Sequence, residues 1–421
     1  MSGEGGGRVA SRYLFLFGSL YAVQGVVVAY ITNFNTNYMI DRGQDIDHAA
    51  TAETIALLPM ALKFLVGPLS DRFNLLGMGH RIPYIVLGVL IQSIGLAGLA
   101  TIDPGGYLVG FGAMALVTVV GLALYDTCCD GMVLDVTPPG DRARAQGVLW
   151  VSRFAATTLC SFGFGRYLAL PGNGQAGVPQ ILGACALLGL IPLFLSRFAP
   201  ESPRAADAER FSWKALAILG RPWTLALLVY GGFYAMAALG AEFKLGAYYK
   251  GLGFGNDEIG TLASVRYAGR AVGALLLPFA ARRVGQRSLI LAGLLNLIVA
   301  TAAQAAIGGP DGSRGPYTAE IAAFYFGVSN GWNDALFGVL AMQGSDPRLA
   351  ASTFALVMAV SNLSVVGNSL FTLVATRMGG FRNAYLLASG SIVPLLLLAI
   401  PLGRPGPAAH VHPDAEVGDT P

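Results

Sequence analysis

The chain has 421 residues, of which 54% are hydrophobic and only 12% are charged, and its formal net charge at pH 7 is +3. Soluble domains carry about 25% charged residues, so this chain has too few charges to cover a water-soluble surface. The composition therefore excludes an ordinary soluble or nucleic-acid-binding protein. It predicts an all-α polytopic membrane protein embedded in the lipid bilayer.

Twelve apolar runs are long enough to cross a bilayer as helices. They lie near residues 13–33, 49–70, 82–101, 107–134, 145–169, 178–196, 222–246, 258–281, 288–307, 317–342, 350–375 and 383–403. The longest polar connection separates the sixth run from the seventh. We therefore expect two six-helix bundles, 13–198 and 222–403, a cytoplasmic linker at 199–221, and disordered tails at 1–12 and 404–421.

The basic residues outside these runs are distributed unevenly between the two sides. Sixteen fall on the side that carries both termini and five on the other, and the remaining six of the 27 lie inside runs. Cytoplasmic loops are enriched in Lys and Arg. The distribution therefore predicts that both termini are cytoplasmic, in a bacterial inner membrane.

An internal repeat relates the fourth run to the tenth. Asp130 is followed by Asp141-Arg142 in the next turn, and Asp334 is followed by Asp346 and Arg348. Repeated halves are common in transporters, and this repeat predicts two related bundles.

The second run carries Lys63 and ends in Gly67-Pro68-Leu69-Ser70-Asp71-Arg72, with a basic pair at 80–81. This motif resembles the loop between helices two and three of the major facilitator superfamily. The form with Lys63 and Pro68 resembles the branch of muropeptide permeases, folate–biopterin transporters and acetyl-CoA transporters.

The resemblance implies two pseudo-symmetric six-helix bundles around a central cavity, with every third helix packed outside. It also implies that the loop after the second helix latches one conformation of an alternating cycle. The candidate gating residues are Asp71 and Arg72 in that loop, and Arg142, Arg144 and Arg348 as their partners.

Charged residues lie inside the runs, where each costs about 3 kcal/mol or more if it faces lipid. The basic ones are Lys63, Arg153, Arg166, Lys244, Arg266 and Arg270, and the acidic ones are Asp126, Asp130, Glu242 and Asp334. Glu53, Glu258 and Glu320 lie nearer the ends of their runs. The third, sixth, ninth and twelfth runs contain no such charge, which agrees with the plan that the resemblance implies.

Two pairs of these charges share a helix face, because residues four apart are neighbours on a helix. Asp126 and Asp130 form an acidic pair, and Arg266 and Arg270 form a basic one. The two pairs either neutralise each other across the halves or bind an ion, and the acidic pair is a candidate for proton coupling. A fixed salt bridge, for example between Lys63 and Asp130, is the structural alternative.

The predicted substrate-binding or proton-coupling residues are Lys63, Asp126, Asp130, Arg153, Arg266, Arg270, Trp332 and Asp334. Asn and Gln side chains near the first helix, at Gln24, Asn33, Asn35 and Asn37, are candidate hydrogen-bonding contacts.

No nucleophile–base set, metal-ligand spacing or phosphate loop can be assembled from the sequence, so we expect neither an enzyme nor a cofactor or metal. Six buried bases against four acids favour a polar, anionic organic solute. The sequence therefore predicts a monomeric, proton-coupled secondary transporter. A non-transporting relative that assembles pigment–protein complexes is the alternative.

Overall fold

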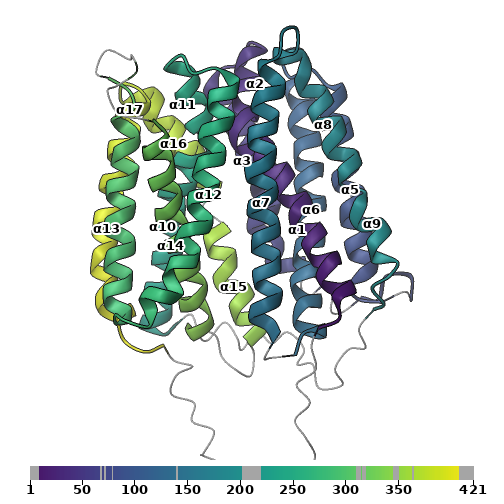
Figure 1. The fold of residues 1–421 in the computed structure, drawn as a ribbon, viewed down its shortest axis with the longest axis vertical. Helices are drawn as coiled ribbons and strands as arrows, with labels where there is room; N and C mark the ends of the chain where they lie inside the picture. Colours follow the sequence, from purple (N-terminus) through teal and green to yellow (C-terminus); the bar gives the residue numbers. More distant parts are fainter. Residues whose placement is uncertain are drawn as a thin grey trace, which may run out of the picture.

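The computed structural model describes residues 9–66, 69–70, 73–77, 79–138, 141–201, 220–309, 314, 319–344, 350–362 and 365–406. The regular structure in these ranges is helical, and the long helices run in one common direction through an elongated bundle (Figure 1). The end at which α1 (Ser11–Tyr30) begins and α18 (Ala399–Leu402) ends is called the terminal side. The opposite end, with the turns at 42–45 and 378–380, is called the far side.

The first half of the chain makes six crossings. The first consists of α1, the π-helix η1 (Ile31–Asn35) and α2 (Thr36–Asp41), and the second of α3 (Ile46–Leu62) and η2 (Lys63–Leu65). They are followed by α5 (Ile82–Thr101), α6 (Leu108–Val136) and α7 (Arg142–Ala169), and then by α8 (Gly177–Leu188) with α9 (Ile191–Ser196). Short 3₁₀ turns, η3 (Leu75–Gly77) and η5 (Gly174–Ala176), lie in the connections.

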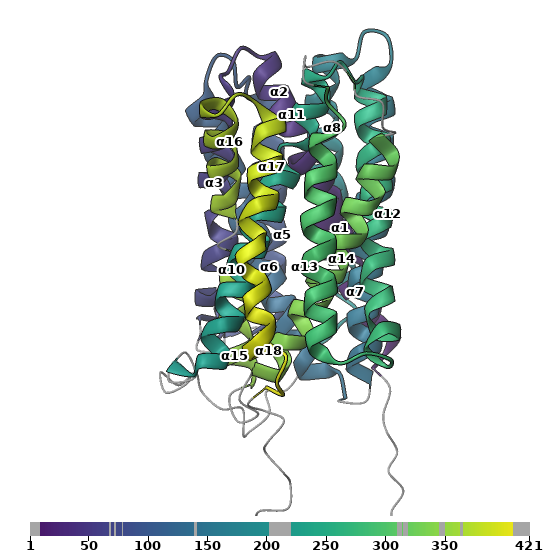
Figure 2. The same cartoon turned by 90° about the vertical axis from the view of Figure 1, so that its left-hand side faces the viewer.

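The second half repeats this arrangement. Its first crossing is α10 (Pro222–Phe243) with α11 (Leu245–Gly251), followed by α12 (Asn256–Ala281), α13 (Gln286–Ala305) and α14 (Ala319–Gly344). The last two are α15 (Ala350–Asn362) with α16 (Val366–Arg377), and α17 (Phe381–Ile392) with η9 (Val393–Leu398) and α18. Figure 2 shows α13 and α17 side by side at one edge of this half. Each of the twelve predicted runs corresponds to one crossing, so the predicted all-α fold is confirmed.

Eight described crossings are apolar and long enough to span a membrane by composition alone. The other four contain α3, α7, α12 and α14. These helices carry Glu53, Arg153, Arg266, Arg270 and Asp334, whose side chains lower the hydropathy of their segments. Asp126 and Asp130 of α6 and Glu242 of α10 lie in crossings that remain apolar overall. All of these charged side chains need partners inside the protein.

The two halves pack against each other through apolar side chains at the far side. One hydrophobic core includes Phe34 and Tyr38 of the first half together with Leu245, Tyr249 and Phe371 of the second. A separate core belongs to the second half alone and lies nearer the terminal side, and a small cluster of Leu57, Val119 and Val365 also joins the halves. Among the described residues, the hydrogen bonds and ion pairs between halves lie from the middle of the bundle to the far side.

Helices α7 and α12 form a close contact between the halves (Figure 1). A Cβ atom added at Gly165 would lie 2.6 Å from the backbone oxygen of Asn256 and 2.8 Å from the Cα of Gly260. Glycine is therefore needed here so that the two backbones can approach.

The predicted linker and tails lie largely outside the described residues, at 1–8, 202–219 and 407–421. The described start of the linker contacts the first half. The Glu201 carboxylate accepts hydrogen bonds from the backbone N–H groups of His80, Arg81 and Ile82, at 3.1, 2.8 and 2.8 Å. These donors lie at the start of α5, where a helix has unpaired N–H groups that favour an anion.

Candidate functional site

The first of three groups of buried charge lies within the first half. Lys63 Nζ is 2.8 Å from Asp126 Oδ2, and Gln24 Nε2 donates to Asp126 Oδ1 at 3.1 Å. Tyr21 donates its hydroxyl proton to Asp130 Oδ1 at 2.6 Å. Lys63 lies in the 3₁₀ turn that follows α3, so the change in helix type positions its amine beside α6. The salt bridge that we suggested for Lys63 and Asp130 is formed with Asp126 instead.

Arg153 belongs to the same group but has no ion-pair partner among the described residues. Its guanidinium carbon lies 5.6 Å from the ring centroid of Trp150. It nevertheless interacts electrostatically with both Lys63 and Asp130. Trp150 in turn contacts the Tyr21 ring edge-on at 6.4 Å between centroids, and its side chain is 41% exposed. Arg153 and Trp150 thus present a cation and an accessible aromatic ring next to two carboxylates.

The second group lies within the second half and centres on Arg270. Its Nη2 is 2.7 Å from Asp334 Oδ2, and its Nη1 is 2.9 Å from Glu242 Oε2. Arg266 Nε lies 3.4 Å from Glu242 Oε1, and Tyr234 donates to Asp334 at 3.2 Å. Every charge in this group therefore has an opposite charge within reach.

The third group bridges the two halves. Lys244 Nζ lies 2.7 Å from Glu53 Oε2, and the two side chains are 0% and 2% exposed. One of the two possibilities for the like-charged pairs was that they neutralise each other across the halves. This is wrong, because Asp126 pairs with Lys63 in the first half, whereas Arg266 and Arg270 pair with acids of the second half. The sequence placed Glu53 near a span end, but its carboxylate is enclosed by Asn35, Lys244 and Asn368.

Arg266 also contacts the opposite half, although through a neutral partner. Its Nη2 donates to Asn33 Oδ1 at 2.7 Å, and Asn33 lies in the π-helix of the first crossing. Gln24 and Asn33 thus bond to charged side chains of the protein itself, Asp126 and Arg266. Arg266 is 1% exposed, so its guanidinium is enclosed in this arrangement.

The excess of buried basic residues inferred from the sequence is wrong. Arg166 is 60% exposed at the far side, where it lies 3.8 Å from Asp257, and Glu53 adds a buried acid. Five bases and five acids remain in the three groups: Lys63, Arg153, Lys244, Arg266 and Arg270, and Glu53, Asp126, Asp130, Glu242 and Asp334. Each group is neutral when all of its side chains are ionised.

Trp332 lies apart from these groups. Its indole N–H donates to the backbone oxygen of Leu289 at 3.2 Å, so the ring packs α14 onto α13. Successive helical residues are about 100° apart, so Trp332 and Asp334 point to nearly opposite faces.

The predicted gating residues are only partly described. Asp71, Arg72 and Arg348 lie outside the described residues, as does the side chain of Arg142 at the start of α7. Arg144 is half exposed, and its Nη1 lies 3.7 Å from Asp141 in the preceding turn. Near this loop, Arg81 Nε makes an ion pair with Asp135 at 2.9 Å, a contact that we did not predict.

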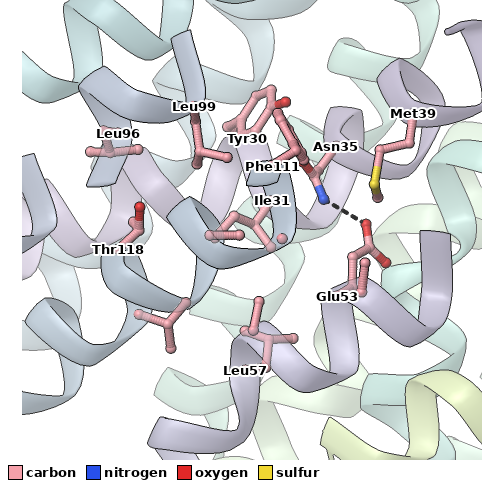
Figure 3. Close-up of a pocket in the computed structure, with 15 residues that line it drawn as sticks. Tyr30, Ile31, Asn35, Met39, Glu53, Leu57, Leu96, Leu99, Phe111 and Thr118 are labelled. Atoms are coloured by element: carbon pink, nitrogen blue, oxygen red, sulfur yellow. Dashed lines mark hydrogen bonds between the residues drawn. The ribbon is translucent and has the colours of Figure 1, made fainter. Parts of the chain in front are cut away.

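A small pocket lies inside the first half near the far side (Figure 3). It is lined by Tyr30, Ile31, Asn35, Met39, Ala52, Glu53, Ala56, Leu57, Leu96, Leu99, Phe111, Gly112, Ala115, Thr118 and Val119. Figure 3 shows the Asn35 amide directed at the Glu53 carboxylate, which it contacts at 2.8 Å. The volume open to the centre of a water molecule is about 20 Å³. One water needs about 10–15 Å³, so the pocket has room for water but not for an organic solute.

Comparison with solved structures shows transporter folds. A point mutant of the nucleoside transporter NupG superposes with a TM-score of 0.74 at 13% identity and covers 93% of this chain and 100% of that one. The D-xylose–proton symporter gives a TM-score of 0.73 at 14% identity and covers 94% and 97%.

Comparison of sequences gives a closer likeness. The chain is 25% identical over 354 residues to the anhydromuropeptide permease of Escherichia coli strain K12, an alignment that covers 80% of this chain and 69% of that protein. The family model of the Major Facilitator Superfamily matches residues 13–367. The chain makes twelve crossings, its groups of buried charge lie inside the bundle, and the family model matches most of its length. It is therefore an integral membrane protein that belongs to the Major Facilitator Superfamily of transporters.

Proposed function

We propose that the protein moves a polar, anionic organic solute across the membrane by alternating access, driven by a proton gradient. The observation that carries the proposal is the placement of neutralised charge groups on both halves. In addition, the hydrogen bonds and ion pairs that the described residues make between halves lie from the middle of the bundle to the far side. Charged side chains in membrane helices mark solute and proton pathways. Polar contacts between halves toward one side suit a protein whose halves rock about a central site.

The two halves of the proposed transporter are residues 13–198 and 222–403, joined at 199–221. The terminal side is proposed to face the cytoplasm and the far side the periplasm, with the protein as a monomer in the inner membrane. The loop residues Asp71, Arg72, Arg142, Arg144 and Arg348 keep their proposed gating role on the terminal side.

Arg153 is the proposed contact for the anionic group of the solute. Of the cations in the three groups, Arg153 is the one that has no carboxylate partner among the described residues. Trp150 beside it offers a ring to an apolar or sugar face of the solute. Similarity to an anhydromuropeptide permease favours a muropeptide-like solute.

The test is uptake of an anhydromuropeptide into proteoliposomes that contain the purified protein. We expect saturable uptake, and we expect Arg153→Ala to raise the half-saturation concentration about tenfold or more, since a charged hydrogen bond contributes about 1.5–3 kcal/mol. Arg153→Lys keeps the charge and should lose less affinity. Absence of saturable flux would favour the non-transporting alternative, and equal affinity in all three proteins would remove Arg153 from the site.

Asp130 is the proposed proton carrier of the first half. Its partner is the neutral Tyr21 hydroxyl, whereas Asp126 is held by Lys63. We expect Asp130→Asn to abolish gradient-driven accumulation while exchange of labelled for unlabelled solute continues. Asp103→Asn, at an exposed far-side carboxylate 3.7 Å from Arg42, is the control and should accumulate normally. Full accumulation by the Asp130 variant would exclude this role.

A further inference from the structure

Three crossings meet around the carboxylate of Glu53, and two of them are interrupted there. The first crossing changes to a π-helix at 31–35, and the seventh breaks at Lys244 between α10 and α11. The eleventh contributes Asn368, in the first turn of α16. Discontinuous helices build ion and solute sites in transporters, and π-turns occur frequently at functional sites.

The Glu53 carboxylate accepts hydrogen bonds from both halves. Oε1 accepts from Asn35 Nδ2 at 2.8 Å and from Thr36 Oγ1 at 2.7 Å, both within the first half. Oε2 accepts from Lys244 Nζ at 2.7 Å and from Asn368 Nδ2 at 3.3 Å, both in the second half. With the far side closed, the ionised form of Glu53 is therefore fully bonded.

Separation of the halves on the far side would divide these partners. Glu53 would keep Asn35 and Thr36 but lose Lys244, the cation that it contacts in the described part of the chain, and the amide of Asn368. An unpaired charge that remains partly buried is costly. Next to the apolar wall of the pocket, the cheapest compensation for the carboxylate is a proton.

Among the residues that the structure describes, the other groups that face Glu53 leave Lys244 as its one charged neighbour. Tyr30 of α1 is titratable and interacts electrostatically with Glu53, whereas α5 and α6 present neutral side chains such as Leu96 and Thr118. The Tyr30 hydroxyl is buried and has no hydrogen-bond partner among the described residues. It belongs to the pocket wall in Figure 3, which has room for a water that could carry a proton to Glu53.

We propose that Glu53 is a proton-binding residue of a far-side gate, and that it exchanges Lys244 for a proton when the far side opens. The inference rests on the proposed alternating access and assigns a second proton site, on the other side of the bundle from Asp130. Since the open state binds one more proton than the closed state, acid favours opening by up to about tenfold per pH unit.

The test measures the far-side distance between halves and needs no substrate. Spin labels are placed at Asp45→Cys and Met378→Cys, exposed far-side positions on opposite halves, in a Cys160→Ser background. Distance distributions are recorded in liposomes from pH 8 to pH 5. We expect the long-distance population to grow as the pH falls. Glu53→Gln should keep the long-distance population high at every pH.

The matched control is Glu258→Gln, which removes a far-side carboxylate paired with Arg314 inside the second half. It should keep the pH response of the parent protein. The charge exchange Glu53→Lys with Lys244→Glu should restore the short distance if the pair holds the gate.

An unchanged pH response in Glu53→Gln would overturn the proposal. Opening of the parent protein at high pH would also overturn it, because that would indicate loss of a proton from Lys244. Because distances are measured without solute, a protein that shows no flux can still confirm or refute the gate.

Discussion

Arg270→Ala is expected to lower the free energy of unfolding by about 3–5 kcal/mol, since it leaves buried carboxylates without their main partner. Arg270 is shared by Asp334 and Glu242, at 2.7 and 2.9 Å. Arg266 remains only at 3.4 Å from Glu242, and Asp334 retains Tyr234. Thermal unfolding of the purified protein in detergent measures the loss.

Arg314→Ala is the control for this substitution. Arg314 also makes an ion pair, with its Nη2 2.8 Å from Glu258 Oε2, but both side chains are more than 40% exposed. Exposed ion pairs contribute little to the free energy of unfolding. Arg270→Met combined with Asp334→Asn should recover much of the stability, because Glu242 then remains paired with Arg266 and no unpaired charge is left. If Arg270→Ala melts at the temperature of the control, the second group does not stabilise the fold.

Gly165→Leu is expected to shift the protein away from the state that is closed on the far side. Its side chain would be forced against the α12 backbone near Asn256 and Gly260. Overpacking costs about 1–3 kcal/mol, so the ratio of open to closed forms should rise roughly 5- to 150-fold. The far-side spin-label distance reports the shift, and uptake should fall with it.

Gly163→Leu, two residues earlier on α7, is the matched control because no atom lies within 4 Å of a Cβ at that position. It should leave both the distance and the uptake rate unchanged. The same short distance in Gly165→Leu and Gly163→Leu would mean that α7 and α12 separate without opening the far side.

Periodicity and composition were sufficient to predict the twelve crossings, because lipid imposes length and hydropathy on each span separately. Breaks within crossings were not predictable in the same way. The π-helix at 31–35 begins within a predicted run, the interruption at Lys244 lies within another, and neither segment contains a proline that would mark a break.

The candidate site was predictable as a set of charged residues but not as a set of pairs. Lys63, Asp126, Asp130, Arg270 and Asp334 do gather into groups, because a buried charge needs a partner. Which acid pairs with which base depends on the relative rotation of the helices, which the sequence does not specify. Lys63 therefore pairs with Asp126, whereas we had suggested Asp130. Glu53 was missed as a central residue because its partners come from separate crossings of both halves, which the sequence does not bring together.

The neutrality of each charge group has a consequence for how the membrane potential acts on the protein. An elementary charge moved through 100 mV gains about 2.3 kcal/mol, whereas a balanced group moved as a unit gains nothing. The voltage across the membrane would then do work on the charge that a solute or proton brings, while the unloaded carrier would reorient at a rate that voltage hardly changes.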